Sequence, residues 1–426
     1  MLVTVISVIH MRKNFFIRAV NFMQAIGIVA EYNPFHNGHQ YHIEEAKAQT
    51  QADGVIAVMS GNFTQRGEAA VFDKWTRAEL ALTSGADLVL ELPAAFAVRS
   101  AAYFASGAVQ TLTATGICPY LSCGVETENT ADLTHLAAYL AEEPAEYQNT
   151  LQEYLQTGLS FPQARQKALE TQNISGADII SQPNNILALH YLETIHRYGL
   201  SMKPLMITRR GQYHDPSLPA DSSAFASASA IRKLLLQQNS SWEEQVPEPV
   251  ARLMKKHMQK GFAPMQMELF APAIFTLLRR STPEELSEIL EISEGLEHRI
   301  YDAAFQTETL NDLCAAIKSK RYTYTRIQRT LCHLLLNMKQ DMAFNTPQYI
   351  RVLGFTETGQ KLLKVMKKTA QLPVIMRPAR QRGLLNTDAQ RMLALDIRAT
   401  SLYMTAYPSA IRPKANLDLL QMPVKV

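Results

Sequence analysis

The first half of the chain alternates continuous apolar runs with helix-like stretches. The apolar runs lie at residues 25–32, 54–59, 86–92, 120–125 and 204–208. Uninterrupted apolar runs separated by helices are typical of a parallel sheet buried on both faces and joined by right-handed crossovers. The pattern therefore predicts an α/β fold, with a Rossmann-like, doubly wound parallel sheet.

Beyond about residue 245 the sequence shows only helical periodicity, interrupted by prolines. We therefore expect an α/β catalytic domain over residues 23–244 and an all-helical domain over residues 245–426. Residues 1–22 are apolar, but their charges follow the apolar run, which is the reverse of a signal peptide, and the run is too short to span a bilayer. We expect translation to start at Met23 and residues 1–22 to lie outside the fold.

Composition adds little, but the distribution of charge is informative. Residues 313–426 carry 19 Lys and Arg against 5 Asp and Glu, whereas residues 1–312 carry 23 basic and 34 acidic residues. Such segregation points to nucleic-acid binding, although a solvated basic helical surface would look the same. The four cysteines form no CxxC pair, so we expect buried free thiols, no metal site and a cytoplasmic location.

The strongest chemical signal is the segment EYNPFHNGHQYH at residues 31–42. A predicted strand ends here, and His36, Gly38 and His39 lead into a predicted helix. A helix N-terminus offers unpaired N–H groups to an anion, and Gly38 lets the backbone approach a nucleotide closely. Two imidazoles at this spacing can both stabilise charge that develops on an α-phosphate as pyrophosphate leaves. His36 and His39 are therefore the predicted catalytic residues, with Arg232 as the third.

Arg232 belongs to a second motif, ASASAIR at residues 226–232, which follows the fifth predicted strand. Ser227 and Ser229 can cap a helix and donate to phosphate, while Arg232 supplies a fixed charge for the β- and γ-phosphates. The motif resembles the ISSTxIR signature of nucleotidyltransferases. Alone it is an ordinary helix cap beside a surface arginine. Because it follows HNGH in the same chain, however, the motif indicates an ATP site.

Six segments together resemble a narrower group. They are EYNPFHNGH (31–39), MSGNFTQRGE (59–68), KWTRAE (74–79), GADLVLELP (85–93), PNNILAL (183–189) and RRGQYHD (209–215). Together these segments resemble the bacterial tRNA(Met) cytidine acetate ligase family, and the segment KRYTYTRIQR (320–329) is also similar to that family. The resemblance implies an enzyme that makes acetyl-adenylate from ATP and acetate. The acetyl group then passes to N4 of the wobble cytidine of elongator tRNA(Met).

The resemblance also implies nucleotide contacts. Those near the first motif are Val29, Ala30, Glu31, Tyr32, Asn33, Pro34, Phe35, His36, Asn37, Gly38, His39, Gln40, Tyr41 and His42. Gly124, Asn185 or its neighbour Asn184, and Arg209 or Arg210 would complete the pocket. Arg66 and Lys74 are candidates to hold a carboxylate or phosphate, though either is also consistent with a surface charge. We expect Mg²⁺ to accompany the triphosphate, without a dedicated protein cage.

Basic residues interleaved with aromatics in the second half are candidates for tRNA binding. They are Lys320, Arg321, Tyr322, Arg326, Arg329, Arg377, Arg380 and Arg382, with Tyr322 or Tyr324 available to stack an unpaired base. No membrane or stable protein partner is expected. A small-molecule adenylyltransferase is the alternative enzyme, and an RNA-binding module with a degenerate nucleotide fold is a third hypothesis. The intact motif residues argue against the latter.

Overall fold

The computed structural model describes residues 23–208, 225–408, 410–413 and 416–426. The expectation about residues 1–22, and the candidates Arg209 and Arg210, therefore fall outside the described residues.

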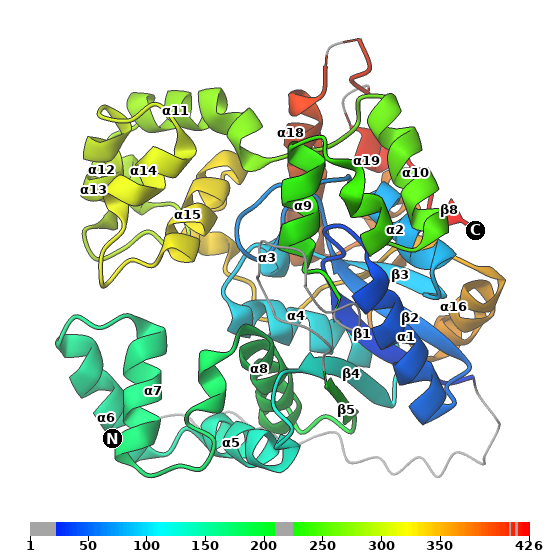
Figure 1. The fold of residues 1–426 in the computed structure, drawn as a ribbon, viewed down its shortest axis with the longest axis horizontal. Helices are drawn as coiled ribbons and strands as arrows, with labels where there is room; N and C mark the ends of the chain where they lie inside the picture. The colour runs from blue at the N-terminus through cyan, green and yellow to red at the C-terminus, as the bar shows by residue number, and fades with distance from the viewer. Residues whose placement is uncertain (1–22, 209–224, 409, 414–415) are drawn as a thin grey trace.

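An eight-stranded sheet forms the centre of the molecule (Figure 1). Its strand order is β5-β4-β1-β2-β3-β6-β7, and β8 also pairs with β6. The strands are β1 (Ala25–Ala30), β2 (Gly54–Ser60), β3 (Leu88–Leu92), β4 (Tyr120–Val125), β5 (Lys203–Thr208), β6 (Ile350–Phe355), β7 (Val374–Ile375) and β8 (Val424–Lys425). The first five are mutually parallel, with Ile28 opposite Ala57 and Leu121 opposite Pro204. The predicted α/β fold with a parallel sheet is confirmed.

Helices cover both faces of this sheet. The helices of the first half are α1 (Asn37–Thr50), α2 (Lys74–Thr83), α3 (Ala94–Ala97), α4 (Ala101–Ala114), α5 (Thr130–Glu142), α6 (Ala145–Gln156), α7 (Phe161–Thr171) and α8 (Pro183–Arg197). Right-handed crossovers place α1 and α2 on one face and α4 and α8 on the other, where α8 packs against α4 and α5. Sheet and helices share one core, because nearly every strand residue of β1 to β4 is buried.

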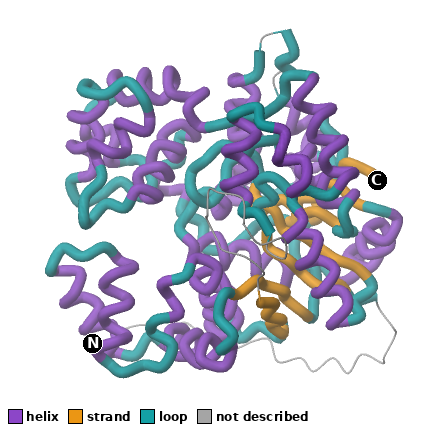
Figure 2. The backbone as a smooth tube through the Cα atoms, viewed as in Figure 1, coloured by secondary structure: helices purple, strands orange, loops and turns teal. Residues whose placement is uncertain are grey.

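The second half contributes helices both beside the sheet and apart from it (Figure 1). They are α9 (Ala228–Leu236), α10 (Glu248–Gln259), α11 (Ala271–Arg280), α12 (Pro283–Ser287), α13 (Leu296–Ala304), α14 (Leu310–Ile317), α15 (Tyr324–Leu336), α16 (Glu357–Thr369), α17 (Pro378–Gln381), α18 (Thr387–Tyr403) and α19 (Leu417–Leu420). Figure 2 shows that α11 to α15 form a helical lobe separate from the strands.

The expectation of an all-helical region over 245–426 is wrong, because the chain returns to the sheet after this lobe. Strand β6 pairs antiparallel with β3, with Leu90 opposite Val352, and β7 and β8 pair with opposite ends of β6. Helix α16 then packs against β2, β3 and β6, and Thr369 Oγ1 at its end donates to the carbonyl of Thr115, the residue that caps α4, at 2.9 Å. Periodicity alone cannot separate a short, mostly apolar strand from part of a buried helix, and IRVLGF, which is apolar except for Arg351, is such a run.

Candidate nucleotide-binding site

A cavity of about 380 Å³ lies at the carboxyl ends of β1, β4 and β5. The strand order reverses between β1 and β4, since the chain runs from β1 to β3 in one direction and then continues on the other side of β1. In open α/β sheets ligands bind at such a switch point. The cavity is thus where a nucleotide site is expected from topology.

The HNGH motif lies at one wall of this cavity. His36 is the N-cap of α1, and its Nδ1 accepts from the Gly38 N–H at 3.1 Å. The Nδ1 of His39 accepts from the His36 N–H at 3.2 Å, and the two rings stack with centroids 3.6 Å apart. Because both Nδ1 atoms accept, the neutral rings carry their protons on Nε2 and present them as donors. This arrangement suits stabilisation of a phosphate by two imidazoles.

The second motif lines the same cavity and contacts the loop before the first motif. Ser227 is the N-cap of α9 and accepts from the Ala230 N–H at 3.1 Å. Arg232, on the first turns of the same helix, donates to the Asn33 carbonyl at 2.8 Å and pairs with Glu68 at 3.2 Å. Ser227, Ser229 and Arg232 all line the cavity, so the structure brings the two motifs together around one space.

Most of the remaining candidates near the first motif also line the cavity. These are Val29, Ala30, Glu31, Tyr32, Asn33, Tyr41 and His42. Four others do not line it: Pro34 and Phe35 are buried, Asn37 donates to the Glu244 carbonyl and Gln40 to Glu44. His42 also contacts Ser122 Oγ of β4 at 2.7 Å, so it joins α1 to the sheet.

Asn184 and Asn185 have different roles in this wall. Asn184 lines the cavity together with Gly124, and its amide donates to Glu126 at 2.7 Å. Asn185 is fully buried, accepts from the Glu126 N–H at 2.8 Å and donates to Gln182 at 2.6 Å. Asn185 therefore fixes the loop after β4, whereas Asn184 is placed to contact a ligand.

Sequence reasoning named Arg66 in the loop after β2, but it missed Gln65 and Glu68 of the same loop, and it assigned Arg329 of α15 to tRNA and not to this cavity. Gln65, Arg66 and Glu68 line the cavity from this loop, and Thr325 and Arg329 line it from α15. The two elements touch closely at Gly67, which has a φ of +76°: a Cβ there would lie 2.6 Å from the Gln328 carbonyl oxygen. The MSGNFTQRGE motif was the available signal. Nothing in the sequence placed α15 beside it.

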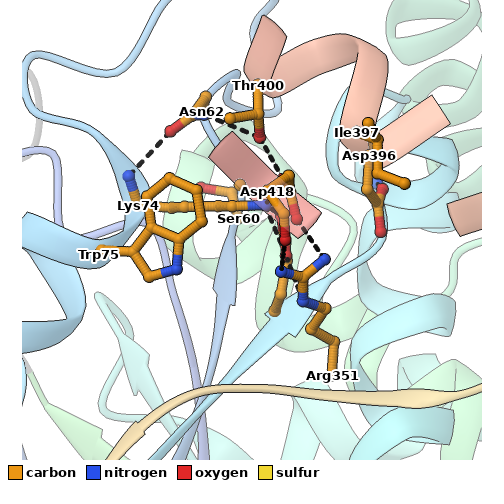
Figure 3. Close-up of polar contacts among 12 residues, drawn as sticks. Ser60, Asn62, Lys74, Trp75, Arg351, Asp396, Ile397, Thr400 and Asp418 are labelled. Carbon is orange, nitrogen blue, oxygen red and sulfur yellow. Dashed lines mark hydrogen bonds and ion pairs between the residues drawn. The ribbon is translucent and has the colours of Figure 1, made fainter. Parts of the chain in front are cut away.

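The other candidate in this part of the chain, Lys74, is not a ligand-binding residue. Its ammonium group is fully buried and lies 2.6 Å from Glu91. It also lies 2.6 Å from Asp418 (Figure 3). Arg351 pairs with Asp418 and lies 3.7 Å from Glu91. We call Lys74, Glu91, Arg351 and Asp418 the buried charge network. Lys74 was a candidate either to hold a carboxylate or phosphate or to be a surface charge, and both interpretations are wrong, because its ammonium group is buried and paired with two carboxylates.

The buried charge network extends to the loop after β2 and to α18. Asn62 accepts from the Lys74 N–H at 2.8 Å and donates to Thr400 at 3.2 Å. Burial opposes ionisation of Asp418, but Lys74 and Arg351 lower its pKa to about 2. Nearby Asp396 accepts from the Ala94 N–H at 2.8 Å, and burial together with the charge of Glu91 raises its pKa to about 7.

The basic candidates of the second half divide by exposure. Lys320, Arg321, Arg377, Arg380 and Arg382 are exposed.

The candidates on and next to α15 are instead engaged within the helical lobe. Arg329 pairs with Glu291 at 3.1 Å, and Arg326 lies 3.7 Å from Glu294. Tyr322 is only 5% exposed and its hydroxyl donates to the Glu294 carbonyl at 2.5 Å, so its ring is not open to a base in this conformation. Tyr324 is partly buried, and its hydroxyl donates to Asn311 at 2.9 Å.

Two further observations concern the described residues as a whole. No helix within them is long and apolar enough to cross a membrane. No group of three or more His, Cys, Asp or Glu side chains within them could hold a metal ion. All four cysteines are free and buried, as expected, and burial raises the pKa of Cys118 and of Cys123 to about 12.

The chain is similar to known proteins over nearly its whole length. A family described as HIGH Nucleotidyl Transferase matches residues 23–417. Proteins named tRNA(Met) cytidine acetate ligase from Halothermothrix orenii and Thermoanaerobacter sp. are each 40% identical, covering 93% and 95% of this chain and 98% and 100% of theirs. The crystal structure of Thermotoga maritima TmcAL bound with alpha-thio ATP is 34% identical, with a TM-score of 0.89, covering 95% of this chain and all of that one. The chain therefore belongs to the HIGH nucleotidyltransferase family and, within it, to the tRNA(Met) cytidine acetate ligases.

Proposed function

We propose that this protein activates acetate with ATP and transfers the acetyl group to N4 of the wobble cytidine of elongator tRNA(Met). The observation that carries the proposal is one cavity lined by residues of both HNGH and ASASAIR, in a chain that is 40% identical to proteins named for this reaction. The bound alpha-thio ATP in the related Thermotoga maritima structure supports ATP as the substrate of this cavity.

In the first step an acetate oxygen attacks the α-phosphorus and pyrophosphate leaves. Acetate needs this activation, because its own leaving group would be oxide, whereas acetyl-adenylate releases AMP. His36 and His39 donate from Nε2 to the α-phosphate, and Arg232 with Ser227 and Ser229 holds the β- and γ-phosphates. Catalysis here is positioning and charge stabilisation, with no covalent protein intermediate.

We place acetate beside Arg66. Its guanidinium lines the cavity and forms no ion pair with any carboxylate in the described parts of the chain, whereas Arg232 is paired with Glu68. A cation of this kind is available to a substrate anion. Mg²⁺ would arrive on the triphosphate, because the described residues form no cage for it.

We place the tRNA on the basic residues of the second half. Exposed Lys320, Arg377, Arg380 and Arg382 are available to phosphates, and they belong to the part of the chain that carries the excess of positive charge. Arg321 is also exposed, but it is paired with Glu294 at 3.3 Å. Arg326 and Arg329 would have to exchange Glu294 and Glu291 for phosphate in order to contact tRNA directly.

The test is ATP-dependent incorporation of radiolabelled acetate into elongator tRNA(Met). The control is the same tRNA with uridine in place of the wobble cytidine. Incorporation that requires ATP and that cytidine is the expected result. Acetate-independent pyrophosphate release with another small acceptor would instead favour a small-molecule adenylyltransferase.

A further inference from the structure

Glu31 stands at the end of β1, directly before the HNGH loop, and its partly buried carboxylate lines the cavity. One carboxylate oxygen accepts from the Gln65 N–H at 2.7 Å. Its main-chain carbonyl accepts from Arg77 at 2.5 Å, and Arg77 is fully buried and also donates to the Ser60 and Phe72 carbonyls at 3.0 Å. The carboxylate is thus held in a fixed position between the two loops that border the cavity.

Transfer of an acetyl group to an amine requires a proton acceptor in this cavity. When the cytidine N4 attacks the acetyl carbonyl, the nitrogen gains positive charge and must lose a proton. His36 and His39 do not serve, because each Nδ1 already accepts a backbone N–H and each Nε2 carries a proton. His42, which also lines the cavity, is held by Ser122 Oγ of β4 at 2.7 Å. The carboxylates among the described residues that line the cavity are Glu31 and Glu68.

The two carboxylates differ in their surroundings. Glu68 is paired with Arg232 at 3.2 Å, on the phosphate side of the cavity. Glu31 forms no ion pair within the described residues. Burial raises the pKa of Glu31, the charge of Glu68 raises it further, and the Gln65 N–H, Arg232 and Arg66 act in the opposite direction. A carboxylate with a raised pKa is the better proton acceptor.

We propose that Glu31 accepts the N4 proton during acetyl transfer. In this step the bond between N4 and the acetyl carbon forms, the bond between that carbon and the adenylate oxygen breaks, and AMP leaves with the electron pair. The N4 proton moves to the Glu31 oxygen opposite the one bound by Gln65. The inference rests on the proposed function, and it assigns to Glu31 a role in the second step beyond contact with the nucleotide.

The experiment isolates the second step by supplying synthetic acetyl-adenylate and elongator tRNA(Met) to the full-length protein in single turnover. Glu31→Gln keeps an oxygen acceptor for the Gln65 N–H, so the loop remains anchored. We expect the transfer rate to fall by about 10²-fold or more. In the unmodified protein we expect the rate of acetyl transfer to rise with pH until Glu31 is ionised. This rising limb of the pH–rate profile should disappear in Glu31→Gln.

Glu68→Gln is the matched control, since it removes a second carboxylate from the same cavity. It should retain the rising limb of the transfer profile and instead weaken acetate-dependent ATP–pyrophosphate exchange through Arg232. Transfer by Glu31→Gln at the unmodified rate, or with the limb intact, would overturn the inference. Absence of any transfer to tRNA by the unmodified protein would instead count against the proposed function.

Discussion

Two groups of charged side chains flank the loop after β2, and they are built in opposite ways. In the buried charge network, Lys74 and Arg351 are fully enclosed and neutralised by Glu91 and Asp418. On the cavity side, Arg66 and Arg232 remain partly exposed, and Arg66 has no carboxylate partner within the described residues. The first group joins α2, β3, β6 and α19, whereas the second faces the space for substrates.

The contrast shows why a charged residue in a motif cannot be assigned to substrate binding from its type alone. Arg66 and Lys74 are eight residues apart and were equal candidates to hold an anion. A buried ion pair gives little net stability, but removing one partner leaves an uncompensated charge. An exposed cation costs little to remove and can bind a ligand. Stability and substrate affinity therefore separate the two groups experimentally.

The largest effect is expected for Lys74→Met. Glu91 and Asp418 would then remain buried with Arg351 as their one cation, and the free energy of unfolding should fall by about 3–5 kcal/mol. Urea unfolding measures it. The control is Lys47→Met, whose ammonium is half exposed and 3.8 Å from Asp87, and which should change stability by about 0.5 kcal/mol at most. Equal, small changes in both variants would contradict the distinction.

For His39→Ala, on the cavity side, we expect a large loss of activity with little change in stability. Acetate-dependent ATP–pyrophosphate exchange should fall by about 10²–10³-fold, because one of two donors to the α-phosphate is lost. Thermal unfolding should shift little, since the ring is partly exposed. His298→Ala, two-thirds exposed and on the helical lobe, serves as control. A loss of fold in His39→Ala that parallels the loss of exchange would assign His39 a structural role.

A smaller effect is expected for Arg66→Met. The KM for acetate in the exchange reaction should rise about tenfold, equivalent to about 1.4 kcal/mol, while the unfolding free energy stays within about 0.5 kcal/mol. Arg66→Lys should recover part of the affinity. An unchanged KM for acetate in Arg66→Met would show that the carboxylate binds elsewhere in the cavity.

The smallest effect concerns pH and Asp396. Its pKa is about 7 in the folded protein against 3.8 in an unfolded chain, so its protonated form stabilises the fold fully at low pH and this contribution is lost as pH rises through 7. Unfolding free energy should fall by about 1 kcal/mol between about pH 6 and pH 8 on this account. Asp418 titrates near 2 and adds nothing in this range. Asp396→Asn should remove the decrease, and a slope that persists would assign it to another group.

Local patterns predicted the parallel sheet and the two ATP motifs, because apolar runs and a strand-to-helix turn are encoded by adjacent residues. Strand β1 ends at Ala30, before the predicted residue 32, because Tyr32 adopts a φ of +46°. What could not be predicted is long-range pairing. Strand β6 was missed because its partner β3 is more than 250 residues away, and Lys74 was misassigned because Asp418 lies 344 residues further along the chain.

This distance between β3 and β6 has a consequence for how the protein is made. During synthesis the edge of β3 emerges from the ribosome with its hydrogen-bonding groups open, and β6 follows only after a delay of roughly 15–50 s at about 5–20 residues per second. In that interval Lys74 and Glu91 also lack the arginine and aspartate that later enclose them. An unpaired strand edge is a template for aggregation. The nascent chain is therefore a natural client for chaperones that act at the ribosome.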